Sequence, residues 1–171
     1  KGRRKLMKPD NFSGFILGFN SCRPKSEGTV CITSSNAGKA PSIRPNYLDH
    51  EDDRDEALAM ARLIERLMAT PALTGILADE PLTPLDKMDD DAVLADFRQR
   101  GGTVFHLCGT CRMGPDAASS VVDSRLRVHG VEGLRICDAS AFPNITSANT
   151  NAPTMMLAHR AAGMILQDGQ R

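Results

Sequence analysis

The chain has 171 residues, which is long enough for one domain with a buried core. Hydrophobic residues make up 41% of it and charged residues 25%, a composition typical of a soluble globular protein. The 21 basic and 21 acidic side chains balance. This balance argues against a dedicated nucleic-acid-binding protein, because such proteins usually carry a clear basic excess.

Other bulk features concern membranes and the redox compartment. No run of about 18 apolar residues occurs, so we expect no membrane span. No signal peptide is visible. The five cysteines are an odd number and do not form the pattern of a secreted disulfide framework. We therefore expect a reducing compartment and a cytoplasmic location, whereas the sequence says nothing about the oligomeric state.

The first 50 residues predict an antiparallel hairpin. Residues 12–22 mix apolar side chains with glycines and lack helical spacing, which indicates a strand. Residues 29–33 alternate and are rich in β-branched side chains, which predicts a second strand. Turn-forming residues 23–28 would join the two strands. Residues 41–47 contain two prolines and are expected to be extended or irregular.

Two helices are predicted next. Residues 52–69 carry acidic side chains in their first turn, which suit the helix dipole, and then apolar residues at helical spacing. Residues 89–99 begin at three aspartates and stop before Gly101 and Gly102. We expect these helices to cover the antiparallel sheet, so the predicted fold class is α+β.

The last third combines short strands with one long helix. Residues 103–106 look extended, and short strand-like segments occur at 121–122, 125–128 and 134–137. Residues 153–167 predict a helix with proline in its first turn. Apolar side chains cover nearly its whole circumference, so this helix should be buried on most sides. The chain has little left over to bury it.

The densest group of reactive side chains lies between residues 105 and 114. His106 could act as a base near neutral pH, or it could be a hydrogen-bonded structural histidine. Cys108 and Cys111 form a C-x-x-C pair, which suggests a redox dithiol or a metal site with His106 or His129. Two buried thiols that pack as small hydrophobic groups fit better, because no second pair of ligands appears.

A second polar stretch, Asn149-Thr150-Asn151-Ala152-Pro153-Thr154, precedes the last helix. Asn and Thr cap helices well, which is one explanation of the pattern. The free N–H groups of a helix N-terminus also suit an anionic group or an electron-rich ring edge. Asp138 follows an apolar segment, where it could bind a ligand hydroxyl or cap a turn.

Taken together, these stretches resemble the glucose–methanol–choline (GMC) family of flavin oxidoreductases, closest to its alcohol and choline dehydrogenase members. The resemblance is most specific in Phe105–Gly114, Val121–Ser140 and Asn149–Thr154, and it extends from about residue 22 to residue 166. Residues 23–28 and 44–48 also look like the family. One departure is Leu107, which stands where many members have proline.

The resemblance implies an FAD-dependent enzyme of the EC 1.1 class that oxidises a small-molecule alcohol. His106 would be the base that draws the hydroxyl proton while the carbinol carbon gives a hydride to flavin N5. Asn149 matches the second catalytic position, which would hydrogen-bond the substrate oxygen. The resemblance also assigns flavin contacts to Phe105, Asp138, Ala139, Asn151 and Ala152, and it assigns no metal.

The family's nucleotide-binding fingerprint, G-x-G-x-x-G, does not occur in this sequence. The resemblance therefore implies a C-terminal portion of a longer protein, whose FAD-binding domain would be the main partner of this chain. Residues 1–105 would form a substrate-binding region, and residues 106–171 would carry the active-site strand and return to the FAD domain. We expect this portion alone to be inactive. The alternative function is a non-catalytic zinc- or thiol-binding module that uses His106, Cys108 and Cys111.

Overall fold

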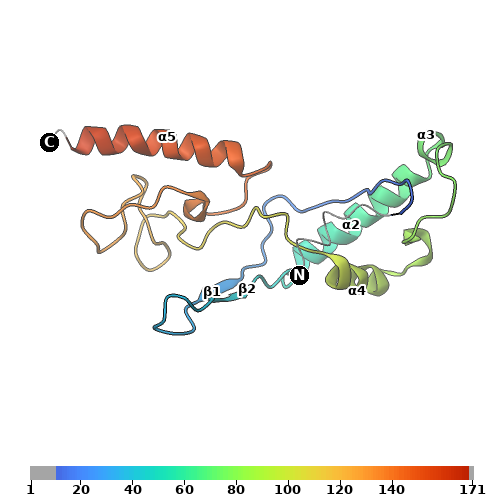
Figure 1. Ribbon diagram of the computed structural model, residues 1–171, viewed down its shortest axis with the longest axis horizontal. Coiled ribbons are helices and arrows are strands. Elements are labelled where there is room, and N and C mark those ends of the chain that lie inside the picture. Colours follow the sequence, from blue (N-terminus) through green and yellow to red (C-terminus); the bar gives the residue numbers. More distant parts are fainter. Residues whose placement is uncertain (1–10, 170–171) are drawn as a thin grey trace.

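The computed structural model describes residues 11–169, which form two lobes with a short β-ribbon beside them (Figure 1). One lobe is helical, and the other consists of loops under one long helix. The elements in chain order are β1 (Thr29–Cys31), β2 (Ser42–Arg44), α2 (Glu51–Met68), α3 (Pro71–Thr74), the 3-10 turn η1 (Leu85–Lys87), α4 (Asp90–Arg100), the 3-10 turn η2 (Ala139–Ala141) and α5 (Asn151–Asp168).

The two predicted helices of the first lobe are confirmed to within two residues. The side chain of His50 caps α2 by accepting a hydrogen bond from the backbone N–H of Asp52. Asp89 caps α4 in the same way, at 2.8 Å from the backbone N of Ala92. Arg62 on α2 then joins the two helices, because its guanidinium donates to the carbonyl of Met88 at 3.2 Å and to Asp90 at 2.7 Å.

The predicted hairpin has a different second strand. Strand β1 pairs antiparallel with β2, with Val30 opposite Ile43, whereas residues 12–22 form no strand. The prolines at 41 and 45 flank β2 rather than lying inside it, so neither removes a ladder hydrogen bond. Most of residues 12–22 are exposed, but the ring of Phe19 lies 5.7 Å from that of Phe97 on α4.

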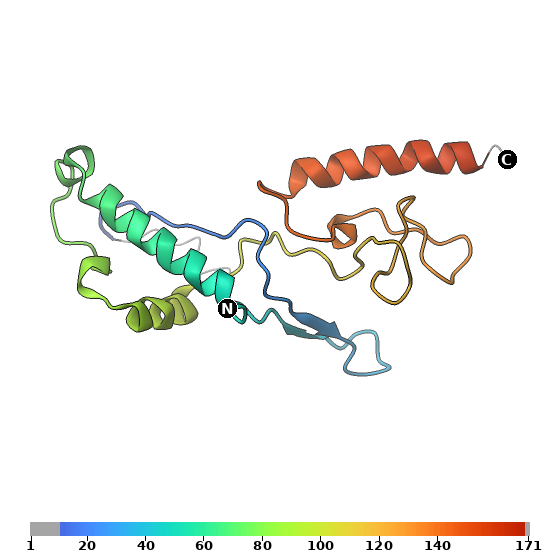
Figure 2. The same ribbon diagram turned by 180° about the vertical axis from the view of Figure 1, so that it is seen from behind.

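The helices do not cover the two-stranded sheet, which corrects the predicted packing. Helix α2 contacts α3, η1 and α4, while the β1–β2 ribbon extends away from them in both views (Figures 1 and 2). Val30 and Ile43 are 51% and 58% exposed on this ribbon. Residues 11–169 thus form a mixed helix and strand fold with a two-stranded sheet, but without a helix-covered layer.

The second lobe has the best-buried core of the described residues. Val122 and Leu126 from the loops and Ala141 of η2 are almost completely buried with Ala161 of α5. The short strands predicted in this region appear as single bridges, such as Val122 with Val128 and Arg127 with Arg135. Helix α5 begins two residues before the predicted start.

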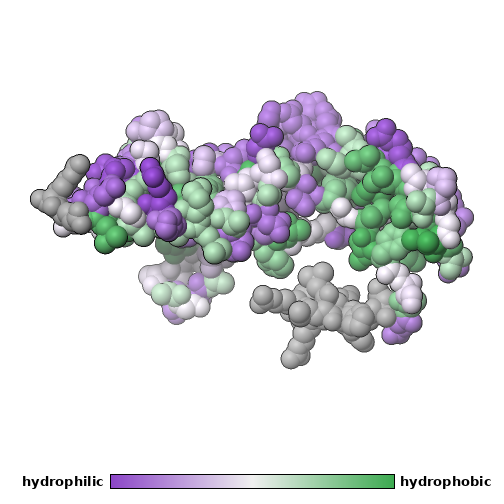
Figure 3. All heavy atoms as spheres, turned by 90° about the horizontal axis from the view of Figure 1, so that it is seen from above, coloured by the Kyte–Doolittle hydropathy of each residue, from purple (hydrophilic) through white to green (hydrophobic). Residues whose placement is uncertain are grey.

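Large apolar side chains remain exposed in both lobes. On α5, Ala161 faces the core, whereas Met155, Met156 and Leu166 are 65%, 61% and 68% exposed. Hydrophobic side chains also gather over the helical lobe when the molecule is seen from above (Figure 3), and Ile16 in that lobe is 90% exposed. No helix within residues 11–169 is both long and apolar enough to cross a membrane.

Candidate functional site

His106 lies against the start of α5. Its Nδ1 atom is 3.0 Å from the hydroxyl oxygen of Thr150, across 44 residues of sequence. Thr150 is buried, with 7% of its surface exposed, and His106 is half-buried. The two stretches singled out in the sequence therefore meet in space, and Thr150 brings the imidazole next to the backbone that carries Asn149 and Asn151.

The segment after His106 is fastened to η2 by its backbone. Cys111 donates to the carbonyl of Ser140 at 3.0 Å, and Met113 donates to the carbonyl of Ala141 at 2.9 Å. Gly109 has a φ of 88°, which favours glycine, and a Cβ there would lie 3.6 Å from the carbonyl oxygen of Phe142. These contacts hold the His106 segment beside the segment that begins at Asp138.

Asp138 has the turn-capping role that was one of its two sequence interpretations. Its carboxylate accepts hydrogen bonds from the backbone N–H of Ser140 at 2.8 Å and from the Ser140 hydroxyl at 2.5 Å. Ala139 opens η2 directly behind it. Asp138 is exposed, so the carboxylate remains accessible while it orders the turn.

The N-terminus of α5 is open. Thr150 occupies the N-cap position, but its side chain makes no capping hydrogen bond. Asn149, Asn151 and Ala152 are all exposed there. The first N–H groups of an α-helix have no partner within the helix, and its N-terminal end carries a positive partial charge. This arrangement fits an electron-rich ring edge such as that of a flavin.

Phe105 has an unusual backbone conformation next to His106. Its φ is 63°, in the left-handed region that non-glycine residues rarely adopt. Its side chain is 71% exposed, and its backbone N–H donates to the Thr103 hydroxyl at 3.0 Å. Backbone strain of this kind is frequent beside functional groups, and here it turns the chain directly before the imidazole.

The C-x-x-C pair has the properties of packing residues. Cys108 and Cys111 are half-buried free thiols. Burial raises the pKa of the Cys108 thiol, although the nearby charge of Arg112 acts in the opposite direction. In the part of the chain that the structure describes, no three His, Cys, Asp or Glu side chains are grouped to hold a metal ion. His106, Cys108 and Cys111 are therefore not assembled as a zinc site.

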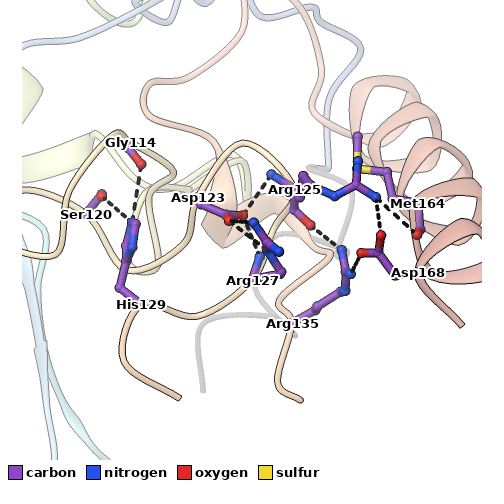
Figure 4. A network of polar contacts seen from close by, with 9 residues as sticks. All are labelled: Gly114, Ser120, Asp123, Arg125, Arg127, His129, Arg135, Met164 and Asp168. Atoms are coloured by element: carbon purple, nitrogen blue, oxygen red, sulfur yellow. Dashed lines mark hydrogen bonds and ion pairs between the residues drawn. The ribbon is translucent and has the colours of Figure 1, made fainter. Parts of the chain in front are cut away.

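A second polar network holds the far end of α5 (Figure 4). The carboxylate of Asp168 accepts a hydrogen bond from the guanidinium of Arg125 at 2.8 Å and also forms an ion pair with Arg135. Arg135 in turn donates to the carbonyl of Arg125 at 2.6 Å. The hydrogen bond from Arg135 is the main reason that the pKa of Asp168 lies below its ordinary value. No sequence pattern indicated this network, because the paired residues are 33 to 43 positions apart.

His129 is a structural residue in this lobe. Its Nε2 atom lies 3.2 Å from the hydroxyl of Ser120 and 3.3 Å from the carbonyl of Gly114. The Ser120 hydroxyl also donates to the carbonyl of Asp116. Figure 4 draws both contacts. A proton on Nε2 can be shared between the two acceptors, so this histidine joins Ser120 to the loop around Gly114.

Comparison with known proteins agrees with this arrangement. A family model described as GMC oxidoreductase matches residues 24–158. The chain is 41% identical over 152 residues to an oxygen-dependent choline dehydrogenase of Proteus mirabilis, covering 89% of this chain and 27% of the relative. It is 38% identical over 154 residues to an alcohol dehydrogenase [acceptor] of Pseudomonas putida, and this match covers 90% of this chain and 28% of the relative.

Solved structures give the same result. The structure of an FAD-dependent oxidoreductase from Chaetomium thermophilum superimposes with a TM-score of 0.80 at 26% identity, and the match covers 87% of this chain and 26% of that one. The chain therefore has the fold of the corresponding part of this oxidoreductase. The chain belongs to the GMC oxidoreductase family, in the part that forms the C-terminal region of its members. It spans about 27% of the length of the curated relatives.

Proposed function

We propose that this chain is the substrate-side, C-terminal part of an FAD-dependent oxidoreductase that oxidises the CH–OH group of a small alcohol. Family membership supports this proposal, as do relatives named choline dehydrogenase and alcohol dehydrogenase. The main observation that supports it is the position of the His106 ring. Thr150 contacts Nδ1 at 3.0 Å, while Nε2 has no hydrogen-bond partner among residues 11–169.

In this proposal His106 and Asn149 act on the same substrate oxygen. The free Nε2 of His106 accepts the hydroxyl proton, and the amide of Asn149 hydrogen-bonds the oxygen and orients it. Removal of the proton as the hydride departs keeps positive charge from building on the carbinol group. Bound FAD supplies the two-electron acceptor for that hydride. The half-exposed position of His106 leaves its ring accessible to a small alcohol.

The open end of α5 is the proposed flavin-facing surface. Its uncapped N–H groups and positive dipole end would stabilise negative charge on an electron-rich ring edge. Exposure of the residues involved supports this assignment, since all of them are exposed except Ala139, which is half-buried. The residues proposed to contact the flavin are Phe105, Asp138, Ala139, Asn151 and Ala152.

The proposed partner of α5 is the FAD-binding part of the same protein. Met155, Met156 and Leu166 are exposed apolar side chains on a helix that already buries Ala161 on another side. Residues 106–171 would thus return to the FAD-binding part, while residues 1–105 would contribute the substrate-binding region. This division accounts for a helix that is apolar around most of its circumference.

Replacing His106 tests the proposed function. In the FAD-loaded protein that contains this chain, His106→Ala should slow flavin reduction by choline or a primary alcohol about 100-fold or more, because general-base catalysis contributes at least that factor. Stopped-flow absorbance of the flavin measures the rate. His50→Asn is the matched control, since His50 is 46% exposed at the start of α2 and Asn also caps helices well. A wild-type reduction rate in His106→Ala would remove this residue from its role.

A further inference from the structure

We infer that Thr150 is a positioning residue that holds the proton of His106 on Nδ1 and so keeps Nε2 available as the proton acceptor. This inference rests on the proposed function, which assigns the base but not the group behind it. The geometry is one contact of 3.0 Å between Nδ1 and the Thr150 hydroxyl oxygen. A neutral imidazole has one donor and one acceptor nitrogen, so this contact determines what the other nitrogen does.

Two arrangements of this hydrogen bond are possible. If the Thr150 hydroxyl donates to Nδ1, the ring proton lies on Nε2, and Nε2 cannot accept a proton from the substrate. If Nδ1–H donates to the hydroxyl oxygen, Nε2 carries the free lone pair. Only the second arrangement is compatible with a base that faces the open side of the site. Thr150 then acts as a hydrogen-bond acceptor toward His106.

Thr150 is held firmly in position beside the imidazole. Its 7% exposure leaves little room for water to replace the hydroxyl. Its backbone carbonyl is anchored by the N–H of Thr154 at 3.0 Å and by the Thr154 hydroxyl at 2.6 Å. The β-branched side chain is stiff about χ1, so the anchored backbone also fixes the position of Oγ1. Thr150 occupies the N-cap position of α5, but its side chain contacts His106 and does not cap the helix.

The same contact matters most once the imidazole has accepted a proton. An imidazolium beside the positive end of an 18-residue helix is disfavoured by the helix dipole. A hydrogen bond from the charged ring to Oγ1 of Thr150 is stronger than one from the neutral ring. Thr150 therefore stabilises the protonated ring at the point where the helix opposes it, which favours proton transfer from the substrate.

Thr150→Val and Thr150→Ser together test the inference in the FAD-loaded protein. The probe is whichever of choline and the simple primary alcohols reduces the wild-type flavin fastest. Thr150→Val should lower the limiting rate of flavin reduction about tenfold, the factor expected for loss of one hydrogen bond to a charged group. The ascending limb of the kcat/KM pH profile should also move to lower pH. Thr150→Ser, which keeps the hydroxyl, should restore most of the rate.

Two further variants separate positioning from simple stability. Thr146→Val is the matched control, because it removes a hydroxyl from the loop before α5 that bonds the carbonyl of Ala148 and not the imidazole. In a His106→Ala background, Thr150→Val should have no additional effect on the reduction rate, since a residue that acts through His106 has nothing to act on once the ring is gone.

The outcomes distinguish this inference from the proposed function. If flavin reduction is slow in His106→Ala but proceeds at the wild-type rate in Thr150→Val, the role of Thr150 is overturned and the proposed function is not. The same conclusion follows if Thr150→Ser is as slow as Thr150→Val, or if the effects of the His106 and Thr150 substitutions are additive. A shift of the ascending limb to higher pH would mean that the hydroxyl donates to Nδ1, which also overturns it. An unchanged reduction rate in His106→Ala overturns the proposed function itself.

Discussion

Asp53 is a buried carboxylate outside the candidate site, and only 5% of its surface is exposed. It accepts hydrogen bonds from the backbone N–H groups of Lys25 at 2.8 Å and Ser26 at 2.7 Å. Burial by itself would raise the pKa of Asp53, but these hydrogen bonds outweigh it, so the pKa lies below its ordinary value. The charged carboxylate thus ties the loop before β1 to the first turn of α2.

Asp53→Asn should lower the free energy of unfolding by about 1–3 kcal/mol at pH 7, because the amide leaves one buried backbone donor without an acceptor. The folded-state pKa of Asp53 is depressed, so its stabilisation is fully present above the unfolded-state pKa of about 3.9 and is lost as the pH falls through the folded-state pKa. Urea denaturation at pH 7 and below pH 4 measures both effects.

Asp52→Asn is the control for this experiment. Asp52 lies in the same turn of α2 and pairs with Lys25, but its side chain is 53% exposed. Exposed ion pairs contribute little to stability, so this variant should change the urea midpoint much less. Equal effects of the two substitutions at pH 7 would show that the buried hydrogen bonds of Asp53 are not the cause.

At the same scale, residue chemistry explains what the sequence could and could not predict. The density of reactive groups around His106 and the run from Asn149 to Ala152 identified both halves of the candidate site. Thr150 was noted only as a helix-capping residue, because capping is the common use of threonine at that position. Its contact with His106 spans 44 residues and depends on the tertiary fold, so no local spacing could reveal it.

Elements with local signals were predicted well, and non-local pairings were not. The helices α2, α4 and α5 follow from periodicity, caps and breakers within each segment. Strand β1 was found by its alternation, but its partner was placed in residues 12–22 instead of β2. Strand pairing depends on which segments meet in space. Gly28, where a Cβ would overlap the carbonyl oxygen of Arg44, marks how closely the two strands approach.

Asp168 attaches the C-terminal end of helix α5 to the loops of the second lobe. An acidic side chain in the last turn of a helix opposes the dipole, and here Arg125 and Arg135 compensate for it. Asp168→Asn should therefore loosen the last turns of α5. We expect faster amide hydrogen exchange there, measured by mass spectrometry, with little change at the start of the helix.

The corresponding control is Asp96→Asn on α4. Asp96 pairs with Arg100 on its own helix, at 2.5 Å, and this pair ties no other segment to α4. Its loss should leave exchange in α5 unchanged. If Asp168→Asn also gave wild-type exchange throughout α5, the two arginines would not be what holds the end of the helix.

At the scale of the whole molecule, a polar contact joins two segments that lie far apart in the sequence. The guanidinium of Arg112 donates to the carboxylate of Glu27 at 2.8 Å, across 85 residues of sequence. Arg112 lies in the segment that carries His106, and Glu27 lies in the loop before β1. The Glu27 side chain is 67% exposed, so the pair contributes little to stability. The pair nevertheless connects the start of the β-ribbon to the segment that carries His106, the candidate general base.

The isolated chain of residues 1–171 should retain FAD poorly. In the proposed division of the site, its exposed residues at the start of α5 form only one edge of the flavin site, and the sequence contains no G-x-G-x-x-G motif to hold the pyrophosphate. Absorbance of the purified chain after gel filtration with added FAD measures retention. Stoichiometric flavin after that step would contradict the proposed division of the site. The protein that also contains the FAD-binding part serves as the positive control.

Helix α5 is attached at both ends, by Thr150 to His106 and by Asp168 to two arginines. Each residue of an α-helix adds about 1.5 Å of length and about 100° of rotation. One inserted residue within α5 would therefore turn one attachment to a different side of the helix while the other stayed in place. The length of α5 is consequently constrained as tightly as the identity of its end residues, and insertions should be tolerated in the loops rather than in this helix.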